Sequence, residues 1–178
     1  VAVAKFGVAL DELETGKDSR AREGMLNLLE EKLPEELRSQ VEYTLGDVNM
    51  RILFSPETTS DDNYYTIKRG DYIYKLAQKF DVPQELILKC NGIEDPRRLQ
   101  IDQRIKIPEV DFSIVVDKSD NTLTLLNNGK FFKKYPVRTG AYENQTPVGE
   151  FKIQNKKEDP RWVNPRTLEV YPPGDPGN

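Results

Sequence analysis

The chain has 178 residues, of which 31% are charged and 37% hydrophobic, and its formal net charge is −4. These values are typical of a soluble, acidic, globular protein without a membrane span, and the scattered basic residues argue against a nucleic-acid partner. The absence of histidine and the single cysteine exclude Ser-His-Asp triads, Cys-His pairs and histidine zinc sites, so we identify no catalytic residue and no metal site.

Apolar residues recur at helical spacing through residues 1–54, which predicts amphipathic helices separated near Gly16 and Pro34, with Asp18 or Ser19 capping the second helix. The pattern is similar to a degenerate tetratricopeptide repeat, and an ordinary small helical bundle fits it equally well. Either arrangement would serve as a scaffold or docking surface. The apolar positions are Phe6, Leu10, Leu13, Ala21, Met25, Leu28, Leu37, Val41, Leu45, Val48 and Ile52.

The polar stretch at residues 55–63 lacks apolar periodicity and predicts a linker. Residues 64–108 follow with the pattern strand, helix, helix, strand, and from residue 111 onward alternating β-branched and aromatic residues predict strands. We therefore expect an α+β multidomain chain with N-terminal helical hairpins, a βααβ module and, at residues 111–178, an incomplete, mostly-β domain.

The middle segment contains the stretches YTIKRGDYIYKLAQKF, VPQELILKCNG and LQIDQRIKIP, which closely resemble the lysin motif (LysM), a module that binds peptidoglycan and chitin. The resemblance implies a shallow groove for N-acetylglucosamine units, formed by the loop after the first strand and the loop before the second. Tyr72 replaces the usual Thr and Ile73 the usual Leu, so Tyr72 would either stack on a sugar or block the groove. The glycan-binding residues implied by the resemblance are Gly70, Asp71, Tyr72, Ile73, Asn91, Gly92 and Ile93.

The same residues also allow a purely structural interpretation. Gly70 can supply a positive φ angle and Asp71 can cap the following helix, and neither role conflicts with glycan binding. Cys90 ends an apolar run and is expected in the core rather than as a nucleophile. The predicted core of this module consists of Ile67, Ile73, Leu76, Ala77, Phe80, Leu86, Ile87, Ile105 and Ile107.

In the last segment, Asn127-Asn128-Gly129 predicts a hairpin turn between two alternating strands. The series Thr139-Gly140 followed by TPVGEF at residues 146–151 closely resembles the N-terminal half of the L,D-transpeptidase catalytic domain. That resemblance implies attack by a Cys thiolate on the third stem-peptide residue, loss of D-alanine and acyl transfer to a neighbouring amine, without a metal or cofactor. The family's His-Gly-Thr and Ser-x-Gly-Cys-x-Arg motifs are missing, so we expect a truncated chain.

Together the resemblances imply an extracytoplasmic bacterial protein, in the periplasm or cell wall, that belongs to an enzyme forming stem-peptide cross-links. The alternative is a non-catalytic peptidoglycan-binding or adaptor protein. The expected partners are glycan strands, stem peptides and a protein docked on the N-terminal helices. No signal segment is found in this sequence.

Overall fold

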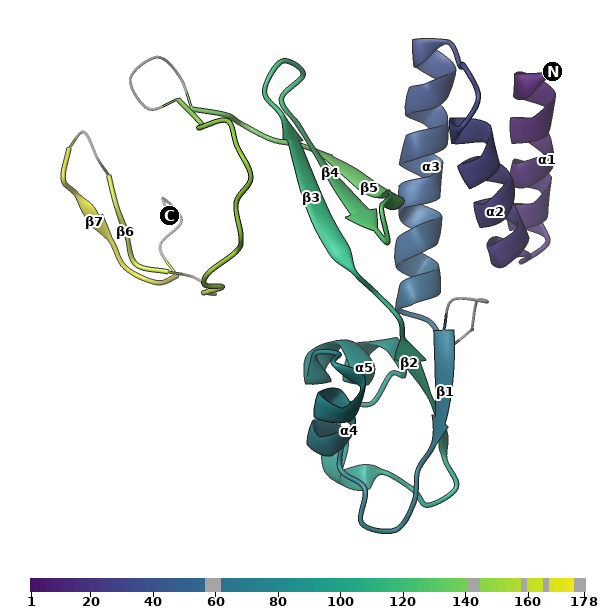
Figure 1. Ribbon diagram of the computed structural model, residues 1–178, viewed down its shortest axis with the longest axis vertical. Helices are drawn as coiled ribbons and strands as arrows, with labels where there is room; N and C mark the ends of the chain where they lie inside the picture. The colour runs from purple at the N-terminus through teal and green to yellow at the C-terminus, as the bar shows by residue number, and fades with distance from the viewer. Residues whose placement is uncertain (57–61, 141–144, 158–159, 165–166, 175–178) are drawn as a thin grey trace. The chain divides into compact units, whose positions relative to one another are not determined.

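The computed structural model describes residues 1–56, 62–140, 145–157, 160–164 and 167–174 (Figure 1). Contacts divide the chain into two compact units, Val1–Thr139 and Gly140–Asn178. Helices and small antiparallel sheets occur in the same chain, which confirms the predicted α+β class. Within the described residues, no helix has the length and apolar character needed to cross a membrane.

Three helices, α1 (Ala2–Glu14), α2 (Asp18–Leu29) and α3 (Glu35–Leu53), form the N-terminal part. Gly16 has a φ of 72° and separates α1 from α2, as predicted. The prediction that Asp18 or Ser19 caps α2 is wrong, because the helix already begins at Asp18 and has no side-chain cap. The Asp18 carboxylate instead pairs with Arg51 of α3.

The helices share one apolar core. The core differs from the prediction at one place in α1. Leu10 is predicted to be buried but is 39% exposed, and Ala9 is buried instead. The choice between a repeat-like hairpin and an ordinary bundle stays open, since three helices fit both. The buried members are Phe6, Ala9, Ala21, Met25, Leu28, Leu37, Val41, Leu45, Val48 and Ile52.

The middle module has the predicted βααβ order, with β1 (Asp62–Thr66), α4 (Ile73–Phe80), α5 (Gln84–Cys90), a short 3-10 helix η1 (Pro96–Arg98) and β2 (Arg104–Pro108). Strands β1 and β2 are antiparallel. The core prediction is confirmed: Ala77, Phe80 and Leu86 pack half-buried against the buried residues, which also include Val82. The buried residues are Ile67, Ile73, Leu76, Val82, Ile87, Ile105 and Ile107.

Strands β3 (Phe112–Asp117), β4 (Thr122–Asn127) and β5 (Lys130–Pro136) form an antiparallel meander. Asn128 and Gly129 have φ angles of 50° and 73°, which suits the predicted tight hairpin turn. Every residue of β3 is exposed, so the alternation predicts a strand correctly but does not indicate a buried face.

A β-bulge in β5 places one residue of the meander against the N-terminal helices and the βααβ module. Leu125 pairs with Lys133 and Leu126 with Phe131, so Phe132 is an extra residue in the strand. Its side chain is 5% exposed and belongs to a cluster with Leu53 of α3 and Cys90 of α5. The prediction that Cys90 lies in a core is confirmed, and this core is the junction of three parts of the first unit.

Helix α3 also approaches the backbone of β5 closely. A Cβ at Gly46 would lie 3.2 Å from Cγ of Lys133, so glycine permits this approach. The buried amide of Asn49 donates to the carbonyl of Phe132 at 2.8 Å, and Lys133 pairs with Asp47 at 2.8 Å. Helix α3 therefore provides a hydrogen-bond donor for a backbone carbonyl of β5, the edge strand of the meander, where another strand could otherwise pair.

Lys106 connects β2 to the end of α3. The residue is 1% exposed, and its Nζ donates to the carbonyls of Ile52 at 2.8 Å and Ser55 at 3.4 Å. These carbonyls lie at the C-terminal end of a helix, where orphan acceptors and the helix dipole favour a cation.

In the second unit, β6 (Trp162–Val163) and β7 (Val170–Tyr171) form a short antiparallel ladder. The rings of Trp162 and Tyr171 stack with centroids 5.3 Å apart. Gly140 donates its backbone N–H to Oγ1 of Thr146 at 2.9 Å, so a hydrogen bond connects two parts of the transpeptidase-like series.

Candidate glycan-binding site

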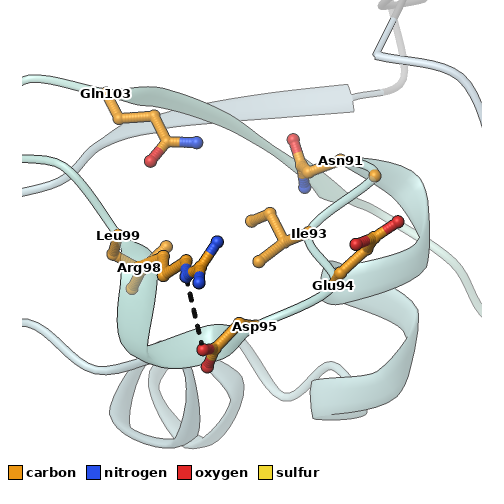
Figure 2. Close-up of a pocket in the computed structure, with 8 residues that line it drawn as sticks. Asn91, Ile93, Glu94, Asp95, Arg98, Leu99 and Gln103 are labelled. Atoms are coloured by element: carbon orange, nitrogen blue, oxygen red, sulfur yellow. Dashed lines mark ion pairs between the residues drawn. The ribbon is translucent and has the colours of Figure 1, made fainter.

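The middle module carries a shallow pocket of about 300 Å³ (Figure 2). It is built by the residues between the end of α5 and the start of β2, including η1. Three predicted residues, Asn91, Gly92 and Ile93, lie in it. The lining residues are Asn91, Gly92, Ile93, Glu94, Asp95, Arg98, Leu99 and Gln103.

Asn91 fixes the shape of this pocket through internal hydrogen bonds. Its Nδ2 donates to the carbonyls of Ile87 and Lys106, both at 2.8 Å. Its Oδ1 accepts from the backbone N–H of Lys106 at 2.7 Å. The side-chain amide is thus committed to joining α5 to β2, and Asn91 shapes the pocket rather than offering its amide to a ligand.

The remaining lining residues are mostly polar or charged, and Ile93 and Leu99 contribute the apolar side chains. Figure 2 shows the Ile93 side chain pointing into the space between Asn91 and Arg98. Asp95 pairs with Arg98 at 3.6 Å, and hydrogen bonds from the side chain and then the backbone of Arg97 lower the pKa of Asp95. Two apolar side chains beside a few polar and charged groups suit an acetamido sugar.

The loop after β1 contains the other predicted residues, and none of them lines the pocket. Gly70 has a φ of 88°, which confirms the predicted positive angle. The side chain of Ile73 is 2% exposed and part of the module's core, so only its backbone could contact a ligand. Tyr72 is 62% exposed and is the one apolar side chain that this loop offers to solvent.

Asp71 does not cap the following helix, so that prediction is wrong. Helix α4 has Tyr72 at its N-cap position and no side-chain cap bond. The Asp71 carboxylate accepts hydrogen bonds from the backbone N–H of Lys68 at 2.7 Å and from the hydroxyl of Tyr65 at 2.9 Å. The side chain turns back and closes the loop, because it satisfies the backbone amide of the residue three positions earlier.

These bonds predict a pH dependence of the loop. The hydrogen bond from the Lys68 amide lowers the pKa of Asp71, whereas accepting from Tyr65 raises the pKa of that phenol. A lowered native pKa means that the contribution to stability is present above about pH 4 and is lost as the pH falls through the native value. NMR titration should place the Asp71 pKa below that of an unfolded Asp. In Tyr65→Phe it should rise only part of the way, and an unchanged pKa would contradict the role of the phenol.

Sequence reasoning missed five pocket residues: Glu94, Asp95, Arg98, Leu99 and Gln103. One local pattern could have located part of this set, since Asp95 precedes Pro96 and caps η1 by accepting from the backbone N–H of Arg97. The contribution of Leu99 and Gln103 depends on how the chain returns to β2, which no local pattern specifies.

The chain offers no accessible nucleophile of the kind that acyl transfer needs. The sequence contains no histidine, and its one cysteine, Cys90, is completely buried. Among the residues that the structure describes, no group of three Cys, Asp or Glu side chains is arranged to hold a metal ion.

Comparison with known proteins gives two adjacent family matches. Residues 65–108 match the LysM domain and residues 111–178 match the L,D-transpeptidase catalytic domain. Both resemblances drawn from the sequence are thereby confirmed, in the predicted order. The helical residues 1–54 lie outside the two matched ranges.

Two curated relatives, from Bacillus subtilis and Bacillus licheniformis, carry the name "Putative L,D-transpeptidase YkuD". They are 32% and 28% identical to this chain over 102 residues, which is 54% of this chain and 62% of each relative. The chain thus spans less than two thirds of the length of the curated relatives it matches.

Proposed function

We propose that this chain binds peptidoglycan through its LysM module and is part of an L,D-transpeptidase that cross-links stem peptides outside the cytoplasm, in the periplasm or cell wall. The observation that supports this most is the order of the two family matches, a LysM domain followed directly by a transpeptidase catalytic domain. Holding the enzyme on glycan strands raises the effective concentration of stem peptides around it.

The pocket between α5 and β2 supplies the physical basis for glycan binding in this proposal. The N–H groups of Gly92 and Ile93 already donate to carbonyls at the end of α5, so side chains at the pocket edge, such as Gln103, would bond to acetamido groups. The exposed ring of Tyr72 in the other loop would pack on the apolar face of a sugar. Asp71 acts indirectly, by holding the loop that carries Tyr72.

Acyl transfer would require a thiolate and a base beyond these 178 residues, since the chain contains no histidine and Cys90 is buried. The same observation favours a second candidate, a non-catalytic peptidoglycan-binding or adaptor protein. The N-terminal helices could in either case carry a protein partner. An assay of D-alanine release by the protein isolated from its host, next to the 178-residue chain, separates the two candidates: release by the host protein alone supports the enzyme.

Co-sedimentation with purified sacculi tests the binding proposal. We expect Tyr72→Ala to weaken binding about fivefold, since the loss of one sugar-aromatic contact costs about 1 kcal/mol. The melting temperature should not change, because the ring is largely exposed. Tyr43→Ala is the matched control, as Tyr43 is 76% exposed on α3.

Two results of this experiment would count against the role of Tyr72 in binding. Equal binding by both variants and the unchanged chain would remove Tyr72 from the site. Stronger binding by Tyr72→Ala would mean that the ring obstructs the groove, which is the other role that the sequence allows.

A further inference from the structure

The positive charge of the LysM module is concentrated around one of its two loops. Residues 64–108 contain nine Lys or Arg and six Asp or Glu. Residues 64–80 hold four of these cations and one acid, whereas residues 81–108 hold five of each. The whole positive excess therefore lies on the segment that carries the loop Gly70–Ile73.

The four cations are exposed, and we call them, together with Tyr72, the cationic face: Lys68, Arg69, Tyr72, Lys75 and Lys79. Among the residues that the structure describes, no carboxylate lies within ion-pair distance of these four cations. Some exposed cations elsewhere in the first unit do have such partners, for example Lys5 with Glu31.

Aromatic rings hold two of the lysines in place instead. Nζ of Lys75 lies 5.3 Å from the ring centroid of Tyr72, and Nζ of Lys79 lies 4.8 Å from that of Tyr65. Lys68 and Lys79 both lie near enough to Asp71 to lower its pKa. Asp71 is the one acid among residues 64–80, so the four cations leave the face with a local excess of positive charge.

We propose that the cationic face binds carboxylates of peptidoglycan stem peptides, so that this module prefers peptidoglycan with stems over a neutral N-acetylglucosamine polymer. The inference rests on the proposed function and adds a substrate preference to it. A neutral glycan has no charge that could pair with the ammonium groups of the cationic face. Each stem peptide, in contrast, brings carboxylates next to the glycan. Stem peptides are favoured over other wall anions because residues 111–178 match the L,D-transpeptidase catalytic domain, whose name describes chemistry on peptides.

The experiment measures binding of the purified chain to sacculi freed of phosphodiester polymers, either with stem peptides or after an amidase has removed them, and to chitin. At about 50 mM salt we expect binding to stem-bearing sacculi to be about tenfold tighter than to the stem-free form. The difference should disappear near 1 M salt, where the Debye length falls to about 3 Å.

Two triple variants with the same change in charge assign the preference to the face. Lys68→Gln/Lys75→Gln/Lys79→Gln should bind both kinds of sacculi equally, at the level of the stem-free form. Lys32→Gln/Lys89→Gln/Lys130→Gln removes three exposed lysines from outside the face and should keep the preference. Melting temperatures of both variants should match that of the unchanged chain.

The outcomes distinguish this inference from the function on which it rests. Equal binding to stem-bearing and stem-free sacculi would overturn the inference and leave glycan binding intact. A preference that appears only with untreated sacculi would overturn it in favour of phosphodiester polymers. Failure to bind any sacculi would overturn the proposed function and the inference with it.

Discussion

Replacing Phe132 by alanine is expected to lower the free energy of unfolding of the first unit by about 3–4 kcal/mol. The ring is 5% exposed and packs among Leu53 and Cys90, and it meets Phe112 edge-on with centroids 5.2 Å apart. Truncation would remove these contacts and leave a cavity that the α3 and β5 backbones, tied together by Asn49, are poorly placed to fill.

Urea unfolding of the whole chain measures this loss. Phe151→Ala is the matched control, since Phe151 is 72% exposed and its truncation should change the stability by less than about 0.5 kcal/mol. Hydrogen exchange adds a second readout, because Phe132→Ala should reduce amide protection in α3 and α5 as well as in β5. A loss confined to β5 would show that the junction does not couple the three parts.

Local patterns predict the βααβ module well because its core is built from neighbouring segments. The alternation predicts a second strand at residues 104–108, and the structure has it at Arg104–Pro108. The six isoleucine and leucine side chains that are buried there all belong to the predicted core. Alternation and helical spacing predict such a module, because the buried residues of each strand and helix recur at regular spacing within that element.

The junction at Phe132 could not be predicted in this way. The pair Phe131-Phe132 occupies adjacent positions in a strand, and alternation would place the two rings on opposite faces. The bulge makes Phe132 an extra residue, and its burial depends on α3 and α5, which lie more than 40 positions earlier in the sequence. Contacts at such separation leave no local periodicity.

Among the predicted binding residues, too, some positions follow from local sequence signals and others do not. Gly92 and Ile93 lie in the pocket because a helix end and a positive φ place them there, and both features have local signals. Asp71 is predicted to cap α4, but its carboxylate bonds to the Lys68 amide and the Tyr65 hydroxyl instead. Two competing local partners cannot be ranked from residue type alone.

Lys106 is the clearest case of tertiary structure overriding a local pattern. In the alternation of β2 it stands between Ile105 and Ile107, where a charged residue normally faces water. In the structure it is buried because the end of α3 covers that face of the strand and supplies carbonyl acceptors.

Lys106→Met should therefore destabilise the first unit by about 2–3 kcal/mol, although methionine is apolar and of similar length. The substitution keeps the buried stem but removes the donor to the Ile52 and Ser55 carbonyls, which lie at the end of α3. A hydrogen bond from a charged donor contributes about 1.5–3 kcal/mol, and the Ser55 hydroxyl, which also donates to the Ile52 carbonyl at 3.2 Å, would replace only part of it.

Lys89→Met provides the control, since Lys89 is exposed in the last turn of α5 and the change should stay within about 0.5 kcal/mol. Urea unfolding gives both values. If Lys106→Met were as stable as the unchanged chain, residue 106 would stabilise the fold through burial of its hydrocarbon stem and not through hydrogen bonds of the ammonium group. A loss as large as predicted, with faster hydrogen exchange at the end of α3, would identify a buried cation as the connection between the helices and the LysM module.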